Sequence, residues 1–343
     1  MERLSIHGDF FDCQLYGGML YLWTFDGSLQ VYNYAAILRE WIRQKGPNRH
    51  HCGAYEGGMS QIYISSEVLN RYLSYERDYL TDEFPTGTEI LAGELFESNA
   101  KGLFRCKIPV FREMMPAEKL CDVPLVYMCG ARRRGLVCAG GSDGLFWRPT
   151  SMTERGLLQV SDRQTIRASF CNPGIYAHSS ITDSFLLVKN RSAYGIEMSE
   201  RELYPIVEQR VYGPKMTWTW NNSFYIAEEH KLKVYDFVST SKPMQLKDEI
   251  QFYYWKGDFV SAGSSECGTV VELDNAICLF EDLHREDGRC TLMEPVTRWR
   301  MYPRSKSFSS HVHIIFDDRM DIVVMNNDLM QWYRMRYLER GVV

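Results

Sequence analysis

A short pattern recurs seven times along the chain: an apolar strand, a polar turn, and a second strand that ends on a large apolar residue. The turns are rich in Asp, Asn and Gly, which tolerate the positive φ angles that tight hairpins require. The seven copies read LYLWTFDGSLQVYNY, LFESNAKGLFRCK, LVCAGGSDGLFWRP, FLLVKNRSAYGIEM, FYIAEEHKLKVYDF, TVVELDNAICLFED and IVVMNNDLMQWYRM. A unit this small cannot bury its apolar face alone, so the copies must stack against one another.

The spacing of the copies indicates the kind of array. From the second copy onward, the residues that end the second strands lie about 46 positions apart on average, close to the length of a four-stranded propeller blade. The predicted fold class is therefore all-β, a seven-bladed β-propeller that forms a single domain over residues 1–343. The strand-ending residues are Tyr32, Phe104, Trp147, Ile196, Tyr235, Phe280 and Trp332.

The first interval is longer than the others and has a different periodicity. Residues 35–45 place their apolar side chains on one side of a helix, and residues 66–80 do the same behind a possible N-cap at Ser65 or Ser66. We therefore predict a small helical insertion over residues 35–80. The alternative is an eighth, degenerate blade that contains residues 61–64.

A propeller avoids a free sheet edge when one blade takes strands from both ends of the chain. Residues 4–6 and 321–325 are both apolar enough to be buried strands. We expect them to pair with each other, with residues 329–333 alongside.

Several of the second strands end in an aromatic residue followed by a polar one. LKVYDF, with Tyr235 and Asp236, is the copy that most resembles the Trp-Asp ending of WD-repeat propellers. The Gly-His pair that WD repeats carry upstream is not recognisable. The chain thus resembles a divergent WD-repeat protein without matching a specific family, and the resemblance implies a rigid fold that presents loops to partners.

Composition and motifs argue against several classes of function. The chain is 45% hydrophobic and carries a formal net charge of −5, which does not suit nucleic-acid binding by bulk charge. It contains no phosphate-binding loop, dinucleotide fingerprint or nucleophile elbow. We expect no secretory signal and no membrane span, because the first residues lack a long apolar core and no stretch approaches about 18 apolar residues. The ten cysteines are scattered without a CxxC pair. We expect reduced core thiols, a cytoplasmic location, no cofactor and no membrane partner, and the balance is against an enzyme.

Two histidine motifs are candidates for metal ligands. His311 and His313 project to the same face of a strand, and Asp317 and Asp318 lie close behind them in the chain. The simpler interpretation is a partly exposed histidine pair without a metal. Residues 50–52, His-His-Cys, lie in the predicted loop between the helices, where adjacent residues rarely bind one ion together. We predict no metal site.

Two sets of residues are candidates for partner binding. Acidic turn residues should gather at one face if each hairpin joins the middle strands of a blade, although Asp also occupies turns for conformational reasons. Aromatic residues of the insertion could anchor a partner or pack the helices onto the blades. The candidates are Asp26, Asp143, Glu228, Glu229, Asp274 and Asp328 in the turns, and Trp41, Tyr72, Tyr75 and Tyr79 in the insertion.

Two basic clusters support a different hypothesis, in which arginine-rich loops bind nucleic acid. The second cluster is interleaved with Trp299, Met301 and Tyr302, a mixture that can stack bases and neutralise phosphates. Solvated loop arginines are the simpler explanation. The clusters are Arg132, Arg133 and Arg134, and Arg298, Arg300, Arg304 and Lys306.

The sequence favours a non-catalytic scaffold or adaptor subunit of an intracellular complex that binds one or more proteins. The alternatives are an enzyme or small-molecule binder that uses the central channel, and a nucleic-acid accessory protein.

Overall fold

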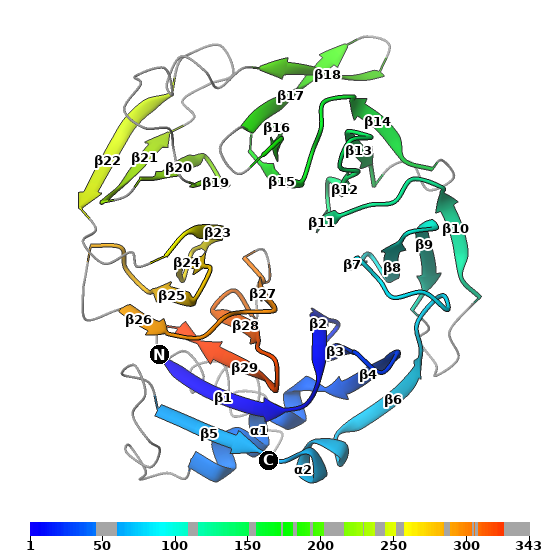
Figure 1. Cartoon of the computed structure of the whole chain (residues 1–343), viewed down its shortest axis with the longest axis vertical. Coiled ribbons are helices and arrows are strands. Elements are labelled where there is room, and N and C mark those ends of the chain that lie inside the picture. The colour runs from blue at the N-terminus through cyan, green and yellow to red at the C-terminus, as the bar shows by residue number, and fades with distance from the viewer. Residues whose placement is uncertain are drawn as a thin grey trace, which may run out of the picture. The chain divides into compact units, whose positions relative to one another are not determined.

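The computed structural model consists mainly of β-sheets in two compact units. It describes residues 1–45, 60–108, 116–150, 156–172, 174–180, 184–192, 195–201, 216–228, 230–236, 244–251, 257–284, 289–303, 305 and 308–325. The first unit comprises residues 1–78 and 257–343, and the second comprises residues 79–256. The described strands form six four-stranded sheets and one five-stranded sheet, labelled in Figure 1.

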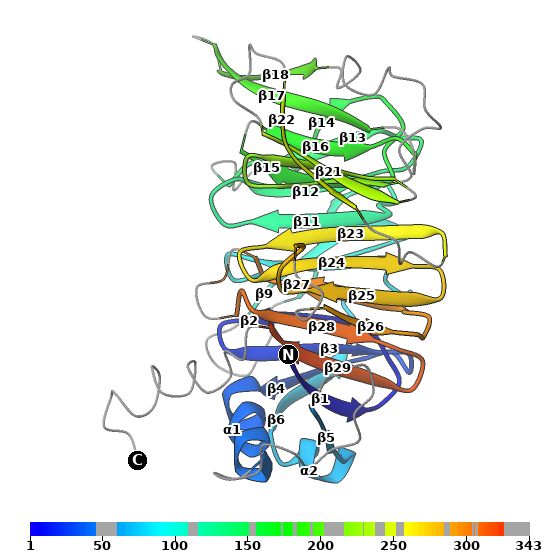
Figure 2. The same ribbon diagram turned by 90° about the vertical axis from the view of Figure 1, so that its left-hand side faces the viewer.

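The first unit contains three of these sheets. One has the order β2 (Phe10–Tyr16), β3 (Met19–Thr24), β4 (Ser28–Asn33) and β6 (Leu73–Asp78). The next, visible as an antiparallel stack in Figure 2, contains β23 (Phe259–Ser265), β24 (Gly268–Leu273), β25 (Ala276–Phe280) and β26 (Arg289–Leu292). The five-stranded sheet contains β27 (Arg298–Met301), β28 (His311–Ile315), β29 (Arg319–Val324), β1 (Glu2–His7) and β5 (Ser60–Ile64).

The second unit contains four sheets, each built from consecutive strands. The first two contain β7 (Gly87–Leu91), β8 (Glu94–Asn99), β9 (Gly102–Lys107) and β10 (Glu118–Cys121), then β11 (Tyr127–Ala131), β12 (Gly135–Ala139), β13 (Leu145–Arg148) and β14 (Leu158–Ser161). The last two contain β15 (Arg167–Cys171), β16 (Gly174–His178), β17 (Ser184–Ser192) and β18 (Gly195–Arg201), then β19 (Met216–Trp220), β20 (Ser223–Ala227), β21 (Lys231–Asp236) and β22 (Gln245–Gln251).

Five of the seven predicted hairpins join the second and third strands of a sheet: β3–β4, β8–β9, β12–β13, β20–β21 and β24–β25. The hairpin around residues 190–196 is real, but it joins the third and fourth strands, β17 and β18. In the last copy, β29 is already the third strand, and residues 326–343 lie outside the described part of the chain. The hairpin pattern does not show which position a strand takes in its sheet, because every antiparallel hairpin has the same alternation and the same turn residues.

The prediction of seven four-stranded blades is wrong. The described strands form six sheets of that kind, and the remaining sheet has five strands. The alternative of an eighth blade is also wrong, because residues 61–64 belong to β5, which pairs in parallel with β1. The extra strand covers the edge that β1 would otherwise leave unpaired.

The predicted pairing of the two chain ends is confirmed. β1 runs antiparallel to β29, with Leu4 opposite Ile322 and Ile6 opposite Met320. All four of these side chains are fully buried. A strand from the first residues of the chain therefore completes the sheet that the described C-terminal strands begin.

A buried polar network joins the three strands β29, β1 and β5. Asp321 is fully buried and accepts a hydrogen bond from Ser5 Oγ at 2.6 Å, while Arg3 Nη1 lies 3.4 Å from its other carboxylate oxygen. Gln61 Nε2 donates to Ser5 Oγ at 2.9 Å, and its oxygen accepts from Arg3. A buried charge is tolerated only when it is paired and hydrogen-bonded, so this register is strongly specified.

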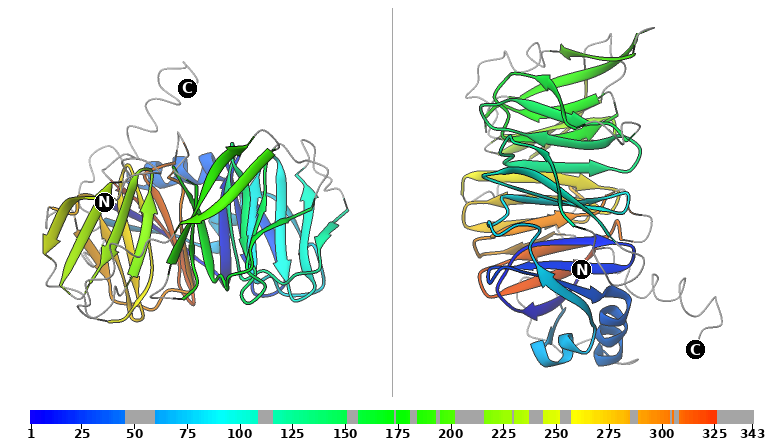
Figure 3. Two further views of the ribbon diagram at one scale, coloured as in Figure 1. Left: turned by 90° about the horizontal axis from the view of Figure 1, so that it is seen from above. Right: turned by 90° about the vertical axis from the view of Figure 1, so that its right-hand side faces the viewer.

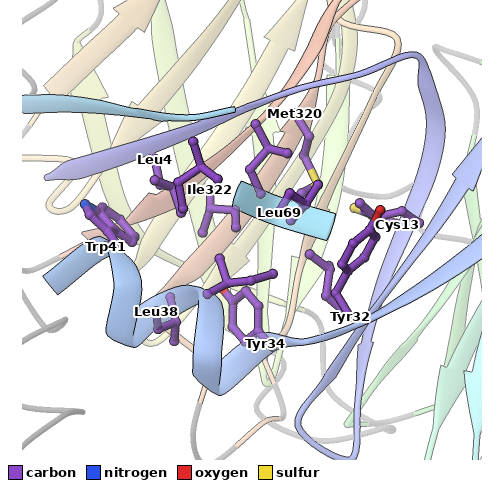
Figure 4. Packing of buried hydrophobic residues seen from close by; sticks show 14 of the residues in the cluster. Leu4, Cys13, Tyr32, Tyr34, Leu38, Trp41, Leu69, Met320 and Ile322 are labelled. Atoms are coloured by element: carbon purple, nitrogen blue, oxygen red, sulfur yellow. The ribbon is translucent and has the colours of Figure 1, made fainter. Parts of the chain in front are cut away.

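The helical insertion is confirmed in part. α1 (Tyr34–Lys45) forms as predicted, and it buries Leu38 and Trp41 against Leu4 and Ile322, as Figure 4 shows. α2 spans only Ser66–Asn70, with Ser65 as its N-cap. Both helices lie at the end of the first unit where β1, β5 and β6 are found (Figure 2, Figure 3).

The prediction that the second helix continues to residue 80 is wrong. Residues 73–78 form β6, in which every second side chain is half-buried and the others are exposed. β6 pairs with β4, placing Tyr75 opposite Val31. The open edge of β4 provides backbone partners along the whole segment, and this pairing outweighs a local helical periodicity. No described helix is both long and apolar enough to cross a bilayer.

We predict that Leu4→Ala lowers the free energy of unfolding by about 2–5 kcal/mol, because it opens a cavity where β1 packs on β29. Urea denaturation followed by circular dichroism measures the change. Glu67→Ala, at a side chain that is 87% exposed, is the control and should change stability by less than about 0.5 kcal/mol. Equal, small effects of both substitutions would contradict a buried N-terminal strand.

Candidate functional site

One end of each sheet carries two kinds of connection. Successive strands are antiparallel, so the turn between the second and third strands and the link from the fourth strand to the next sheet lie at the same end. We call this end of the sheets the loop face. In the first unit it comprises residues 8–9, 25–27, 257–258, 274–275, 293–297 and 316–318.

Backbone hydrogen bonds join these connections to one another in the first unit. The Phe25 N–H donates to the Asp9 carbonyl at 3.1 Å, and the Gly8 N–H donates to the Asp318 carbonyl at 3.0 Å. The Asp274 N–H donates to the Asp258 carbonyl at 2.9 Å. These bonds join the connections in two groups: residues 8–9 are held to 25–27 and to 316–318, and residues 257–258 are held to 274–275.

This surface is strongly acidic. Arg319 neutralises part of it, since its guanidinium lies 3.0 Å from both Glu294 Oε1 and Asp318 Oδ1. Five further carboxylates are exposed and form no ion pair with any described residue. They are Asp9, Asp26, Asp258, Asp274 and Asp317.

The loop face of the second unit has a different charge balance. Lys101 lies 3.2 Å from Asp82 and 3.0 Å from Glu83, and Lys119 lies 2.5 Å from Asp122. Glu228 is paired with two further lysines, Lys231 at 3.3 Å and Lys233 at 2.8 Å. Most carboxylates at this end of the second unit are therefore balanced by neighbouring cations.

Large apolar side chains are also exposed at the loop face. Phe25 is 46% exposed and Met293 66% exposed in the first unit, and Phe84 is 48% and Val126 50% exposed in the second. These are four of the seven large apolar residues exposed in the described part of the chain. Phe25 also packs on Phe11, with ring centroids 5.8 Å apart. The remaining three are Tyr63, Leu246 and Val260.

Most of the predicted turn residues lie at the loop face. Asp26, Asp143, Glu228 and Asp274 lie in or beside turns between second and third strands, as predicted. The carboxylate of Asp26 accepts from Thr24 Oγ1 and the Ser28 N–H, which lowers its pKa. Asp274 Oδ1 accepts from the Asp258 N–H at 3.1 Å. Both therefore hold turns as well as carrying charge. Glu229 and Asp328 lie outside the described residues.

The aromatic residues of the insertion are mainly packed. Trp41 is 1% exposed in the core, and Tyr79 is 7% exposed, with Phe84 edge-on at 6.1 Å. Tyr72 Oη donates to Glu40 Oε2 at 3.2 Å, and Tyr75 is half-buried in β6. Glu40 also accepts from Arg43, and these bonds lower the pKa of its carboxyl to about 2.

Arg298 and Arg300 are bound to a carboxylate that sequence reasoning missed. Asp12 on β2 is fully buried, and Arg300 of β27 donates to both of its oxygens at 2.7 and 2.8 Å. Arg298 pairs with the same carboxylate. The three residues join the first strands of two sheets. The pairing spans almost the whole chain, so no local motif could have shown it.

The remaining basic residues lie elsewhere. Arg132 and Arg133 are exposed in the turn between β11 and β12, at the end of that sheet opposite its loop face. Arg134 donates to the Cys171 carbonyl and so connects two sheets. Arg304 and Lys306 lie outside the described residues.

The interpretation of His311 and His313 as a partly exposed pair is wrong. Both are fully buried, although they do share one face of β28. Tyr34 Oη lies 2.7 Å from His311 Nδ1 and 3.2 Å from His313 Nε2, and Tyr302 Oη lies 3.1 Å from His313 Nδ1. Burial lowers the pKa of His311 to about 3 and that of His313 well below its usual value. The pair therefore hydrogen-bonds in the neutral form.

Metal and thiol chemistry find little support in the described part of the chain. No group of three or more His, Cys, Asp or Glu side chains there could hold a metal ion. The segment at 50–52 lies outside it. The nine described cysteines are free thiols, and burial raises the pKa of Cys13 to about 12 and that of Cys290 to about 11. Such thiols are poor nucleophiles.

Comparison with known proteins identifies the fold. No family model matches the chain, and no curated protein matches it. Among solved structures, the β-propeller domain of Myceliophteria thermophila Cps50 (Swd1) is 9% identical with a TM-score of 0.58, covering 94% of this chain and 100% of that one. The computationally designed Ika8 protein is also 9% identical, with a TM-score of 0.51, covering 94% of this chain and 99% of that one. At this identity the likeness concerns the fold alone: the chain is a divergent β-propeller that resembles WD-repeat proteins.

We predict that Asp12→Ala destabilises the protein by about 3–5 kcal/mol, because it leaves two arginines without their carboxylate. Urea denaturation measures the loss. The control, Asp143→Ala at an exposed turn, should stay within about 0.5 kcal/mol of the parent. A stable Asp12→Ala variant would mean that the arginines are solvated and available for other contacts.

We also predict that acidification destabilises the protein through its buried histidines. In the unfolded chain each histidine takes up a proton near pH 6.5, whereas the folded pKa of His311 is about 3. The unfolded state therefore binds more protons, and the free energy of unfolding falls as the pH drops below 6.5. Between pH 7.5 and 5, His311→Phe should show a shallower decline than the parent. Identical slopes would contradict the neutral buried pair.

Proposed function

We propose that this protein is a non-catalytic binding scaffold, an adaptor subunit of a cytoplasmic protein complex, and that the loop face is its docking surface. The carrying observation is that the loop face of each unit carries exposed apolar side chains, Phe25 and Met293 in the first unit and Phe84 and Val126 in the second. Exposed apolar side chains surrounded by polar residues are typical of protein-interaction surfaces.

The β-sheets explain why this surface suits a scaffold. Each connection is held between paired strands whose inner residues are buried, so the loops lose little conformational freedom on binding. In the first unit the connections are also hydrogen-bonded to one another through Gly8, Phe25 and Asp274. A partner would meet a preformed surface. The proposed contact residues include Asp26, Asp143, Glu228 and Asp274, and the half-buried Tyr72 and Tyr75 could extend the contact from the insertion.

Two alternatives have weaker support. A small-molecule binder or enzyme would use the first strands of the sheets, which line the channel of a propeller, and Asp12 with Arg298 and Arg300 provides ionisable groups on two of them. A nucleic-acid accessory protein would use the exposed Arg132 and Arg133. The Asp12 pairing already occupies two of the arginines on which the nucleic-acid alternative depends.

We further propose that the two units act as one domain. A single cooperative unfolding transition would support this proposal.

Affinity purification from the native cell tests the scaffold. The double variant Phe25→Ser and Met293→Ser removes exposed apolar anchors without opening a core cavity, and it should lose a stoichiometric protein partner that the parent retains. The matched control, Tyr63→Ser with Leu246→Ser, removes side chains that are each 54% exposed elsewhere, and it should retain the partner. Circular dichroism checks that both variants fold. Retention by both variants would contradict docking at the loop face.

A further inference from the structure

We infer that the partner segment that docks on the loop face of the first unit is basic, rich in Lys or Arg with apolar residues between them. This inference rests on the proposed function and adds the chemistry of the partner. Its basis is the uncompensated charge of this surface together with the apolar anchors beside it.

The charge excess is local. Asp9, Asp26, Asp258, Asp274 and Asp317 are exposed without an ion-pair partner among the described residues, whereas lysines balance most of the corresponding carboxylates in the second unit. The whole chain has a net charge of only −5. Bulk composition therefore does not account for five carboxylates on one surface that lack an ion-pair partner among the described residues.

Turn chemistry accounts for only part of this set. Asp26 and Asp274 accept hydrogen bonds from backbone N–H groups in or beside their turns, so their placement has a conformational reason. No comparable bond holds the carboxylate of Asp9 to a described residue, and Asp317 makes one long contact, 3.4 Å from Thr297 Oγ1. Asn or Ser would fill such loop positions without adding charge. The negative potential is thus a property of the surface beyond what its turns require.

Carboxylates lie in the same connections as the exposed apolar side chains, or in connections bonded to them. The Phe25 N–H is bonded to the Asp9 carbonyl, and Asp26 is the next residue along the chain. Met293 lies in the connection that leads to β27, and Thr297 of that connection contacts Asp317 through its Oγ1 at 3.4 Å. An apolar anchor edged by carboxylates complements a segment in which apolar side chains alternate with cations, and like charge would repel nucleic acid or an acidic peptide.

Fluorescence anisotropy of two labelled synthetic peptides tests the inference on the full chain. One peptide is rich in Lys and Arg with interspersed Leu, and the other has every cation replaced by Glu. The basic peptide should bind, and its affinity should fall as salt is raised, because exposed charges are screened over about 8 Å at physiological ionic strength. The acidic peptide should not bind. Equal binding of the two peptides, or no binding of the basic one, would overturn the inference.

A pair of variants with equal net charge separates the surface from the whole molecule. Asp9→Asn with Asp317→Asn should weaken binding of the basic peptide by about tenfold. Glu67→Gln with Glu266→Gln removes the same charge at exposed positions away from the loop face, in α2 and in the turn between β23 and β24, and should leave the affinity within about twofold. Equal weakening by the two variants would mean that the affinity of the peptide depends on the net charge of the protein and not on this surface, which would overturn the site.

Repeating the purification with the Asp9 and Asp317 variant distinguishes this inference from the proposed function. Loss of the native partner supports both. Retention of the partner here, combined with its loss from the Phe25 and Met293 variant, overturns the basic segment and leaves the scaffold standing. Retention by both variants overturns docking at this face altogether.

Discussion

The pairing of β1 with β29 is the interaction on which the first unit depends. It inserts the first residues of the chain between β29 and β5, and it buries Arg3 and Asp321 in a hydrogen-bonded network with Ser5 and Gln61. It also fixes the start of the connection from β1 to β2. Because Gly8 is bonded to Asp318 and Asp9 to Phe25, strand pairing at the chain ends determines which side chains meet at the loop face.

A second link joins the same two sheets through their first strands. Asp12 is buried and bound by Arg298 and Arg300, so two arginines that resemble a nucleic-acid site in the sequence serve as internal counter-ions. Two positive side chains on one buried carboxylate compensate its desolvation, and they tie β27 to β2. The sheets that carry the acidic surface are thus held by paired charges inside, while five carboxylates of that surface have no ion-pair partner among the described residues.

Local features of the fold were predictable from sequence, and long-range ones were only partly so. Turn residues and strand alternation located the hairpins, and helical periodicity located α1, because these signals act within a few residues. The pairing of residues 4–6 with 321–325 could be inferred from the need to protect a sheet edge. The helix predicted at 73–78 is a strand, because its partner β4 lies beyond the range of local periodicity. The burial of His311 and His313 escaped prediction for the same reason, since Tyr34 reaches them from a distant part of the chain.

The candidate surface shows the same division between local and long-range signals. Its acidic turns were predictable, because Asp at a hairpin is a local feature of the sequence. The exposure of Phe25 and Met293 was not, because exposure cannot be read from residue type. Neither was the absence of counter-ions for Asp9 and Asp317 among the described residues, since it depends on which loops the strand pairing brings together.

Hydrogen exchange on the protein alone and in complex with the partner purified from the native cell tests the central claim most directly. If the partner docks on the loop face of the first unit, protection should increase at residues 8–9, 25–27, 274–275 and 316–318. The fourth strands of two sheets in the second unit, β10 and β22, should exchange as they do in the free protein. Protection confined to α1, to β10 and β22 or to the turn at 132–134 would contradict docking at this surface.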